Sequence, residues 1–305
     1  MLTRQRWLMR ADKWRSHDSR HMELTILGSG GNSPIPMPTC DCRVCDEARE
    51  KGEPYARRGN SMFVHDKNVL IDAPELVWYS LNRERITSVD YVFISHFHAD
   101  HTLGLRALQP FGIEQPPVTD FIGEIPTVYM SEVTYKRTIE ASEFFGHLTD
   151  QWANVELLAD GESISFGDFD VTHVAAPIHE GGDDAVSGFL FETADATAFV
   201  SPDENRHFDL KDLPDLDLWI KECGYFGETS GGDPLVTDDA ERNALEHEMT
   251  FQESLNQVRT TQPEQTVFTE IEELYRRSYD DYRELERQHE DLDIAFAYDG
   301  MRIEI

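Results

Sequence analysis

Basic residues are scarce in this sequence of 305 residues: lysine and arginine number 27, only six of them lysine, against 59 aspartates and glutamates. A basic, aromatic-rich surface that would hold long nucleic acid by its backbone is therefore not expected. Long apolar runs are also missing, so no segment is expected to cross a membrane. These shortages argue against a long nucleic acid or a membrane as partner.

The net charge of −32 is extreme for a chain of this length. Because the acidic residues are spread along the sequence and not gathered in one tail, we interpret them as a hydrated surface suited to concentrated salt. The competing interpretation is an acidic protein that binds basic partners. We favour the first and expect a halophilic protein of the cytoplasm.

The first 21 residues break this pattern, since they hold six basic residues against two acidic ones. They contain no apolar core of a signal peptide. Met22 stands directly before the first expected strand, at 23–27. We therefore expect residues 1–21 to be a disordered or untranslated leader, and residues 22–305 to form a single domain.

Cysteine is rare as well, and three of the four cysteines form the sequence Cys40-x-Cys42-x-x-Cys45 just after a glycine-rich turn at 28–33. Three thiols this close together are typical of a thiolate cluster that holds a structural zinc ion. The alternatives are small buried apolar residues, or one disulfide with a spare thiol. The fourth cysteine, Cys223, follows an apolar strand and could complete a four-cysteine zinc site or pack in the core.

Three histidines and an aspartate lie within six positions of the segment 95–101, directly after an apolar run. Imidazole and carboxylate are ligands of Zn²⁺, Mn²⁺ and Fe²⁺. His96 and His98 are two positions apart on an extended segment, so their side chains point to the same side and can share one ion. Asp100 and His101 follow too late to join them and predict a second ion beside the first. The alternative is a polar loop whose histidines are capped and solvated.

This segment resembles the signature of the metallo-β-lactamase fold superfamily, and further matches follow in the family's order along most of the chain. Asp72, at the end of an apolar run, resembles the family's first strand-end aspartate. His179, ahead of the sequence Ser-Gly-Phe at 187–189, resembles the third motif. Asp203 lies where the family places an aspartate that bridges two metal ions. The resemblance, together with the strand pattern, implies a four-layer α/β/β/α sandwich.

The resemblance also implies a pair of divalent ions, zinc or manganese, at one end of the sandwich. The first ion would be held by three histidines, His96, His98 and His179. The second would be held by Asp100, His101 and Glu270, and Asp203 would bridge the two ions. Asp100 and Asp203 would also be catalytic, Asp100 by orienting a water molecule or taking its proton.

The chain departs from the family pattern at two positions, each time by a carboxylate in place of an imidazole. Glu270 stands where the family has its last histidine ligand, and Glu273 stands where one subfamily has the histidine that completes its cysteine-zinc site. Glutamate ligates divalent ions, but its charge makes the cluster less positive and favours Mn²⁺ or Fe²⁺ over Zn²⁺. Alternatively, Glu270 points away and the second ion binds weakly. The fourth ligand of the cysteine cluster stays open between Glu273 and Cys223.

The cysteine cluster, a following arginine pair and the ending at 298–301 resemble the phosphoribosyl cyclic phosphate phosphodiesterase group and, less closely, the pyrroloquinoline quinone biosynthesis protein B group. By this resemblance Arg57 and Arg58 would neutralise a substrate phosphate, although both could equally be surface ion-pair residues. His247 resembles a histidine that opens the penultimate helix, where it would reach substrate; a capping or surface role is the alternative.

Short apolar runs that end in glycine, aspartate or proline predict the strands, with the ligands at their ends. Helices are expected at 74–81, 132–142, 250–260 and 270–291. Thr250 would cap the third of these, because Glu253 follows three positions later. In the fourth, the spacing of four apolar or aromatic residues predicts a core-facing side: Leu274, Tyr275, Tyr279 and Tyr282.

We therefore expect a metal-dependent hydrolase, and in particular a phosphodiesterase that acts on a small cyclic ribose phosphate through a metal-activated water. A nuclease, a thioesterase or a lactonase are alternatives on the same fold, because a fold does not fix a substrate. A noncatalytic metal-binding or biosynthetic accessory protein is the alternative of another class. The sequence is compatible with a homodimer but does not give the oligomeric state.

The charge pattern makes a prediction about salt. Because salt screens the repulsion among surface carboxylates, the melting temperature should rise by about 5 °C or more when KCl is raised from about 0.1 M to 1 M, where the Debye length falls from about 10 Å to 3 Å. Thermal unfolding followed by circular dichroism at a series of KCl concentrations checks this. A melting temperature that stays constant or falls would contradict it.

Overall fold

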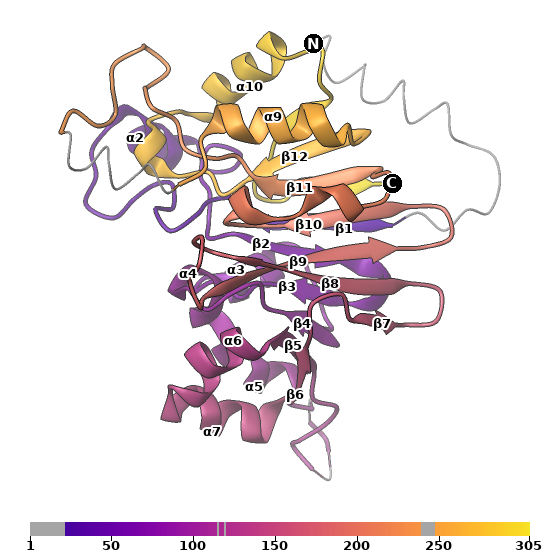
Figure 1. Cartoon of the computed structure of the whole chain (residues 1–305). Helices are drawn as coiled ribbons and strands as arrows, with labels where there is room; N and C mark the ends of the chain where they lie inside the picture. The colour runs from indigo at the N-terminus through magenta and orange to yellow at the C-terminus, as the bar shows by residue number, and fades with distance from the viewer. Residues whose placement is uncertain (1–21, 115, 119, 239–247) are drawn as a thin grey trace, which may run out of the picture.

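The computed structural model of the chain describes residues 22–114, 116–118, 120–238 and 248–305. Within these residues two seven-stranded sheets pack face to face, and helices cover the outer side of each (Figure 1). The predicted four-layer α/β/β/α sandwich is confirmed. The expected leader at 1–21 and His247 lie outside the described residues.

The first sheet has the strand order β14-β1-β2-β3-β4-β5-β6. In that order its strands are Arg302–Glu304, Glu23–Gly28, Ser61–Val64, Val69–Ile71, Tyr91–Phe93, Thr127–Ser131 and Asn154–Leu158. Neighbouring strands from β3 to β6 are parallel, so their carboxyl ends meet at one edge. Asp72 directly follows β3, and the histidine-rich segment 95–101 follows β4 at this edge.

The second sheet has the order β13-β12-β11-β10-β9-β8-β7. Its strands are Ile294–Phe296, Gln265–Thr269, Leu218–Glu222, Thr197–Ser201, Ala185–Glu192, Asp170–Pro177 and Ser163–Ser165. The strands β10 to β13 are parallel. Asp203 therefore follows β10, and Glu270 follows β12, at a common edge of this sheet.

The helices lie on the outer faces, α9 and α10 over the second sheet and α3 and α5 to α7 over the first (Figure 1). In chain order the labelled helices are α2 Arg43–Lys51, α3 Val77–Arg83, α4 Ala99–Thr102, α5 Leu108–Phe111, α6 Glu132–Tyr135, α7 Glu143–Trp152, α9 Phe251–Thr261 and α10 Tyr279–Gln288. The helix predicted at 132–142 is α6 followed by the π-helical turn Lys136–Glu140. None of the helices in the described part of the chain combines the length and the apolar character that a membrane span requires.

One of the predicted helices starts where the sequence indicates, and another starts later. The capping box at Thr250 and Glu253 is present and starts α9 as expected. The helix predicted from residue 270 is wrong over its first part, because α10 begins only at Tyr279. Leu274, expected to face the core, is 52% exposed, whereas Tyr282 is fully buried. The residues ahead of α10 instead form a short coil followed by the 3-10 helical turn Glu273–Tyr275, and this segment carries Glu270 and Glu273 to the edge of the sheet.

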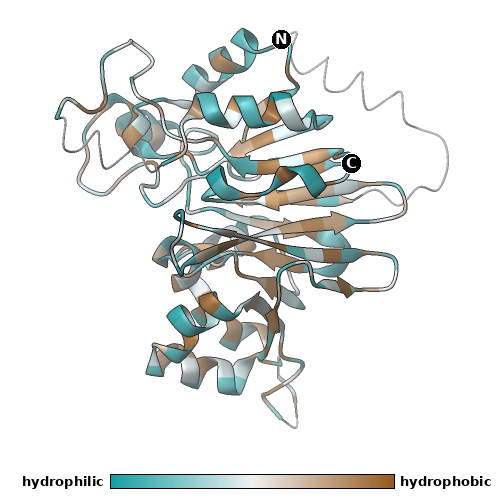
Figure 2. Ribbon diagram, in the orientation of Figure 1, coloured by the Kyte–Doolittle hydropathy of each residue, from teal (hydrophilic) through white to brown (hydrophobic). Residues whose placement is uncertain are grey.

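The main core lies between the two sheets. It contains alternate strand residues such as Phe93, Phe189, Val200 and Ile220, all without solvent exposure. Further apolar clusters lie under the outer helices, α3, α5 and α7 on one side and α9 and α10 on the other. Figure 2 shows the same division, with apolar strands in the centre and polar outer faces on the helices. This rigid double sheet holds the loops at the carboxyl edge in place.

Arg57 links the two sheets and is only 1% exposed. Its guanidinium Nη1 donates to the hydroxyl of Ser29 at 2.9 Å and to the carbonyl of Ala297. Its Cζ lies 5.3 Å from the centre of the Tyr282 ring. Burial lowers the pKa of Arg57 from its ordinary value. Its contacts come from the loop after β1, the end of β13 and α10, so the side chain fixes these elements together.

Replacing Arg57 by alanine should lower the free energy of unfolding by about 3 kcal/mol, because the substitution leaves a cavity and unpaired buried acceptors. Urea unfolding measures this loss. The matched control is Arg287→Ala on α10, whose side chain is 63% exposed and should contribute less than about 1 kcal/mol. Similar losses in the two variants would contradict the structural role of Arg57.

Candidate metal centre

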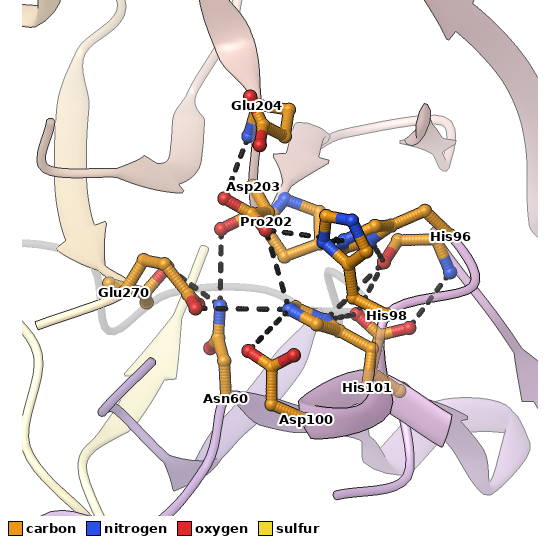
Figure 3. Close-up of polar contacts among 12 residues, drawn as sticks. Asn60, His96, His98, Asp100, His101, Pro202, Asp203, Glu204 and Glu270 are labelled. Carbon is orange, nitrogen blue, oxygen red and sulfur yellow. Dashed lines mark hydrogen bonds and ion pairs between the residues drawn. The ribbon is translucent and has the colours of Figure 1, made fainter. Parts of the chain in front are cut away.

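Loops from the carboxyl edges of both sheets bring three histidines and three carboxylates together (Figure 3). They form two groups, each with ligand atoms that all lie within 4.8 Å of one another: His96, His98 and Asp203, and Asp100, His101 and Glu270. The loops after β4, β10 and β12 supply His96, His98, Asp203 and Glu270, and the short helix α4, which follows β4, supplies Asp100 and His101. Residues far apart in the sequence thus meet because parallel strands end at one edge.

The first group is centred on two imidazole nitrogens. His96 Nε2 lies 2.9 Å from His98 Nδ1 and 3.3 Å from a carboxylate oxygen of Asp203. Burial, together with the neighbouring His96, lowers the pKa of His98. A lowered pKa favours the neutral imidazole, which is the form that binds a metal ion.

The second group is centred on His101 Nε2. This nitrogen lies 3.5 Å from Asp100 Oδ2 and 3.8 Å from Glu270 Oε1. It also lies 3.5 Å from Asp203 Oδ2, the same oxygen that contacts His96 in the first group. Asp203 therefore stands between the groups, in the position that a bridging ligand needs.

Asp72 sets the orientation of the histidines in both groups. The buried Asp72 carboxylate contacts His101 Nδ1 at 2.8 Å and accepts from the Ser95 hydroxyl at 2.7 Å. Because an ionised carboxylate only accepts, His101 carries its proton on Nδ1. Ser95 has given its hydrogen to Asp72, so its 3.0 Å contact with His96 Nδ1 makes that nitrogen the donor. In the neutral, metal-binding form of the two rings, both Nε2 atoms then carry lone pairs that face the carboxylates.

This arrangement fits divalent cations. His101 Nε2 and Glu270 Oε2 are buried and make no hydrogen bond to any described residue. A lone pair that faces carboxylates is repelled unless a cation lies between them. Burial alone would lower the pKa of His101, but Asp72, Asp203 and Glu270 outweigh it and raise the pKa well above the ordinary value. The residues present therefore require a proton or a metal ion here, and the N and O donor set suits Zn²⁺, Mn²⁺ or Fe²⁺.

Glu270 reaches the site through an unusual backbone. Its φ of +57° is left-handed, a conformation that residues with a side chain seldom adopt. Gly31 makes room for it, since a Cβ on Gly31 would lie 2.5 Å from Glu270 Oε1. Burial, and after it the charge of Asp203, raises the pKa of Glu270 well above its ordinary value. Glu270 thus points into the site, which disagrees with the alternative that it points away.

More carboxylates surround the groups. Burial raises the pKa of Glu204 to about 9 and that of Glu222 to about 8, in both cases with the charge of Asp203 as the next cause. At Asp203 itself burial would raise the pKa, but contacts with His101 and His96 outweigh burial and lower it. Raised pKa values mean that these crowded carboxyl groups hold protons at neutral pH unless a cation replaces the protons, so the site favours the binding of cations.

The cysteine cluster forms a third group, Cys40, Cys42, Cys45 and Glu273. The thiols of Cys40, Cys42 and Cys45 lie 3.4, 3.0 and 3.3 Å from Glu273 Oε1. Cys223 lies elsewhere, with its thiol donating to the carbonyls of Gly224 and Glu270. All four cysteines are free, so the disulfide alternative is not realised. Of the two candidates for the fourth ligand, the structure brings Glu273 to the thiols and leaves Cys223 in the core.

Comparisons with known proteins agree with this geometry. Residues 67–271 match the model of the beta-lactamase superfamily domain. The chain belongs to the beta-lactamase superfamily. The predicted family is thus confirmed, and with it the broad class of metal-dependent hydrolases on this fold. Among curated proteins, none matches the sequence significantly.

Several solved structures share the fold at low sequence identity. A diphosphatase of the PhnP family is 23% identical, with a TM-score of 0.70 and coverage of 94% of this chain and 98% of that one. Zinc-bound PqqB from Methylobacterium extorquens is 16% identical, with a TM-score of 0.69 and coverage of 93% and 100%. The short form of human tRNase Z is 15% identical, with a TM-score of 0.58 and coverage of 92% and 98%.

Within this beta-lactamase superfamily fold, some residues predicted for the site lie elsewhere. Arg57, expected to meet a substrate phosphate, is a buried residue that links the sheets, so that prediction is corrected. Arg58 pairs with Glu53 and Asp299 and lies over the ring of Tyr79, which matches the ion-pair alternative. His179 is exposed and belongs to neither ligand group in the described part of the chain. His247 lies outside the described residues.

The sequence interpretation also missed two supporting residues. Gly31 was only part of a glycine-rich turn, and its close approach to Glu270 depends on a contact across 239 positions of sequence. Arg276, which contacts Cys40 and Glu273, had no local signal at all. The orienting role of Asp72 could be found from its place at a strand end, but its partners appear only in the fold.

Replacing Asp72 by asparagine should weaken divalent metal binding about 10- to 100-fold, because the two histidines lose the acceptor that fixes their tautomers. Isothermal titration with Mn²⁺ or Zn²⁺ measures the change in protein whose fold is verified by circular dichroism. The exposed Asp66, substituted in the same way, serves as control and should bind metal normally. An unaltered affinity in Asp72→Asn would rule out this orienting role.

Proposed function

We propose that this protein is a metal-dependent phosphodiesterase that hydrolyses a small phosphate diester at the paired ligand groups. The observation that carries the proposal is the position of Asp203, one oxygen of which lies 3.3 Å from His96 Nε2 and 3.5 Å from His101 Nε2. One carboxylate between two imidazole-containing groups is the arrangement that a pair of divalent ions needs. We assign one ion to His96 and His98 and the other to Asp100, His101 and Glu270.

Bound divalent ions would supply a nucleophilic water at neutral pH and neutralise the charge that develops on the phosphate oxygens. The protein's own residues then have separate tasks. Asp72 and Ser95 hold the histidine rings in the ligand tautomer. Asp100, whose side chain is 15% exposed, is the most exposed member of the second group. We assign it the acceptance of the proton from the attacking water through its carboxylate.

The charges near the site bear on the substrate. Arg57 and Arg58 are engaged in structural contacts, and the neighbouring titratable groups are mostly carboxylates. A phosphate ester would therefore rely on the bound ions for its neutralisation, which favours a compact diester over a long polyanion. The fold similarity to a PhnP-family diphosphatase and to tRNase Z supports a phosphate ester over a thioester or lactone. Within this class we propose a cyclic ribose phosphate.

The second ion should prefer Mn²⁺ or Fe²⁺ to Zn²⁺, because Glu270 adds a hard, negatively charged oxygen ligand to those of Asp100 and Asp203. We propose a structural zinc at the cysteine cluster, since thiolates select softer ions. The proposed setting is a salt-rich cytoplasm, in which the charge of −32 is screened. A homodimer stays a prediction from the sequence.

The test is hydrolysis of bis(p-nitrophenyl) phosphate in about 1 M KCl, where surface charge is screened, with Mn²⁺ or Zn²⁺. Metal-dependent turnover should fall about 100-fold or more in Asp203→Asn, because the bridging charge is lost. The control is Asp195→Asn, an exposed residue in the turn between β9 and β10, at the opposite end of β10 from Asp203.

Two results would count against the proposal. Turnover that is equal in wild type and Asp203→Asn would show that the paired groups do not carry it. No turnover at all from folded, metal-loaded protein would favour another ester class or a noncatalytic accessory role, in line with the fold similarity to PqqB. Metal-dependent turnover that is lost only in Asp203→Asn would justify assays with cyclic ribose phosphates.

A further inference from the structure

Two of the proposed metal sites meet in one short segment of the chain. After β12 ends at Thr269, the next four residues include three glutamates. Glu270 belongs to the group with Asp100 and His101, and Glu273 belongs to the cysteine cluster. Only two residues separate a ligand of one site from a ligand of the other.

This segment is fastened to the glycine-rich loop beside it. The amide of Ile271 donates to the carbonyl of Ser29 at 3.0 Å, and the amide of Glu273 donates to the carbonyl of Ser33 at 2.9 Å. In return, the amide of Ser33 donates to the Glu272 carboxylate at 2.7 Å. Ile271 is fully buried. A displacement at Glu273 would therefore be transmitted to Glu270 and would not be absorbed by a flexible linker.

The conformation at Glu270 needs such support. Its left-handed backbone is disfavoured for a residue with a Cβ and persists where surrounding contacts hold it. One contact is the weak hydrogen bond from the Cys223 thiol to the Glu270 carbonyl, at 3.5 Å. Further support comes from the contacts of Ile271 and Glu272 with the glycine-rich loop, and from Glu273 at the far end of the segment.

The anchor at Glu273 depends on positive charge. Its side chain is fully buried, and its Oε1 contacts the three thiols and the guanidinium of Arg276. Its second oxygen, Oε2, has no hydrogen-bond partner among the described residues. A buried carboxylate that is incompletely paired gains free energy by moving toward water. A metal ion held by the thiols and Glu273 would remove this tendency and fix the segment.

We propose that metal bound at the cysteine cluster positions Glu270, and thereby raises the affinity of the Asp100, His101 and Glu270 group for its own ion. Glu273 is in this sense a positioning residue for the second catalytic ion. The inference rests on the proposed function only in requiring both sites to bind metal. Because coupling between two binding sites is reciprocal, the catalytic ion should strengthen metal binding at the cysteines by the same factor.

The first experiment empties the cluster by Cys40→Ser in the full chain. The neighbouring Asp41→Ser, an exposed substitution in the same loop, is the matched control. Zinc per chain is measured by atomic emission, and Mn²⁺ is then titrated with electron paramagnetic resonance detection of the free ion. The Mn²⁺ binding site that is lost in Glu270→Gln is the site of the second ion.

In Cys40→Ser the affinity for the second ion should fall about tenfold, while the ion held by His96 and His98 should change by less than about threefold. Asp41→Ser should match wild type. If folded, zinc-depleted Cys40→Ser binds the second ion with unchanged affinity, the inference is overturned. An equal loss of affinity for both ions would also overturn the inference, because it would indicate a general loosening of the fold.

The reciprocal experiment covers the case in which Cys40→Ser does not fold. Glu270→Gln should weaken zinc binding at the cysteines about tenfold in competition with a chelator, in the presence of Mn²⁺, although Glu270 contacts none of the three cluster thiols. Glu264→Gln, an exposed position just before β12, is the control. Equal zinc affinity in Glu270→Gln and wild type would refute the coupling. Since both readouts are binding constants, they stand or fall independently of phosphodiesterase turnover.

Discussion

The burial of carboxylates at one edge of a double sheet is the constraint on which the rest of this structure depends. Asp72 is 1% exposed, Glu270 is 7% exposed and Glu273 is fully buried. Buried carboxylates are costly unless hydrogen-bond donors or cations face them. Asp72 is satisfied by Ser95 and His101, whereas the others leave unpaired oxygens. Divalent ions at the two ligand groups and at the cysteines would resolve this imbalance.

The same constraint applies at Glu270 and Glu273, the two positions where the family resemblance implies a histidine. A glutamate adds an acidic group to a site that is already rich in carboxyl groups, and here two features accommodate it. At Glu270, a left-handed backbone directs the carboxylate toward His101, and Gly31, which has no side chain, leaves space for it. At Glu273 the guanidinium of Arg276 offsets the added charge beside the thiols. Both adjustments are local, since they involve single side chains and one backbone conformation at the edge of the sheet.

The metal-binding motifs were predictable because their signal is local. The spacing of the histidines in 95–101 and of the cysteines in 40–45 reports geometry over a few residues, and the structure forms groups from both. The alternation of apolar strands and the capping box at Thr250 likewise act within one element. The prediction of a helix from residue 270 was wrong because charge and apolar spacing resembled a helix, while contacts with Ser29 and Ser33 hold the segment irregular.

By itself, the sequence determined the acidic composition, the strand pattern and the two ligand motifs, since each follows from composition or short-range patterns, and the resemblance of those motifs to a known superfamily implied the sandwich. Only the tertiary structure decided the roles that depend on distant partners. It placed Arg57 between the sheets and away from a substrate role, and it brought Glu273 to the thiols while Cys223 stayed in the core. The physical reason is that burial and pairing are properties of the packed fold, in which strand ends far apart in sequence share one edge.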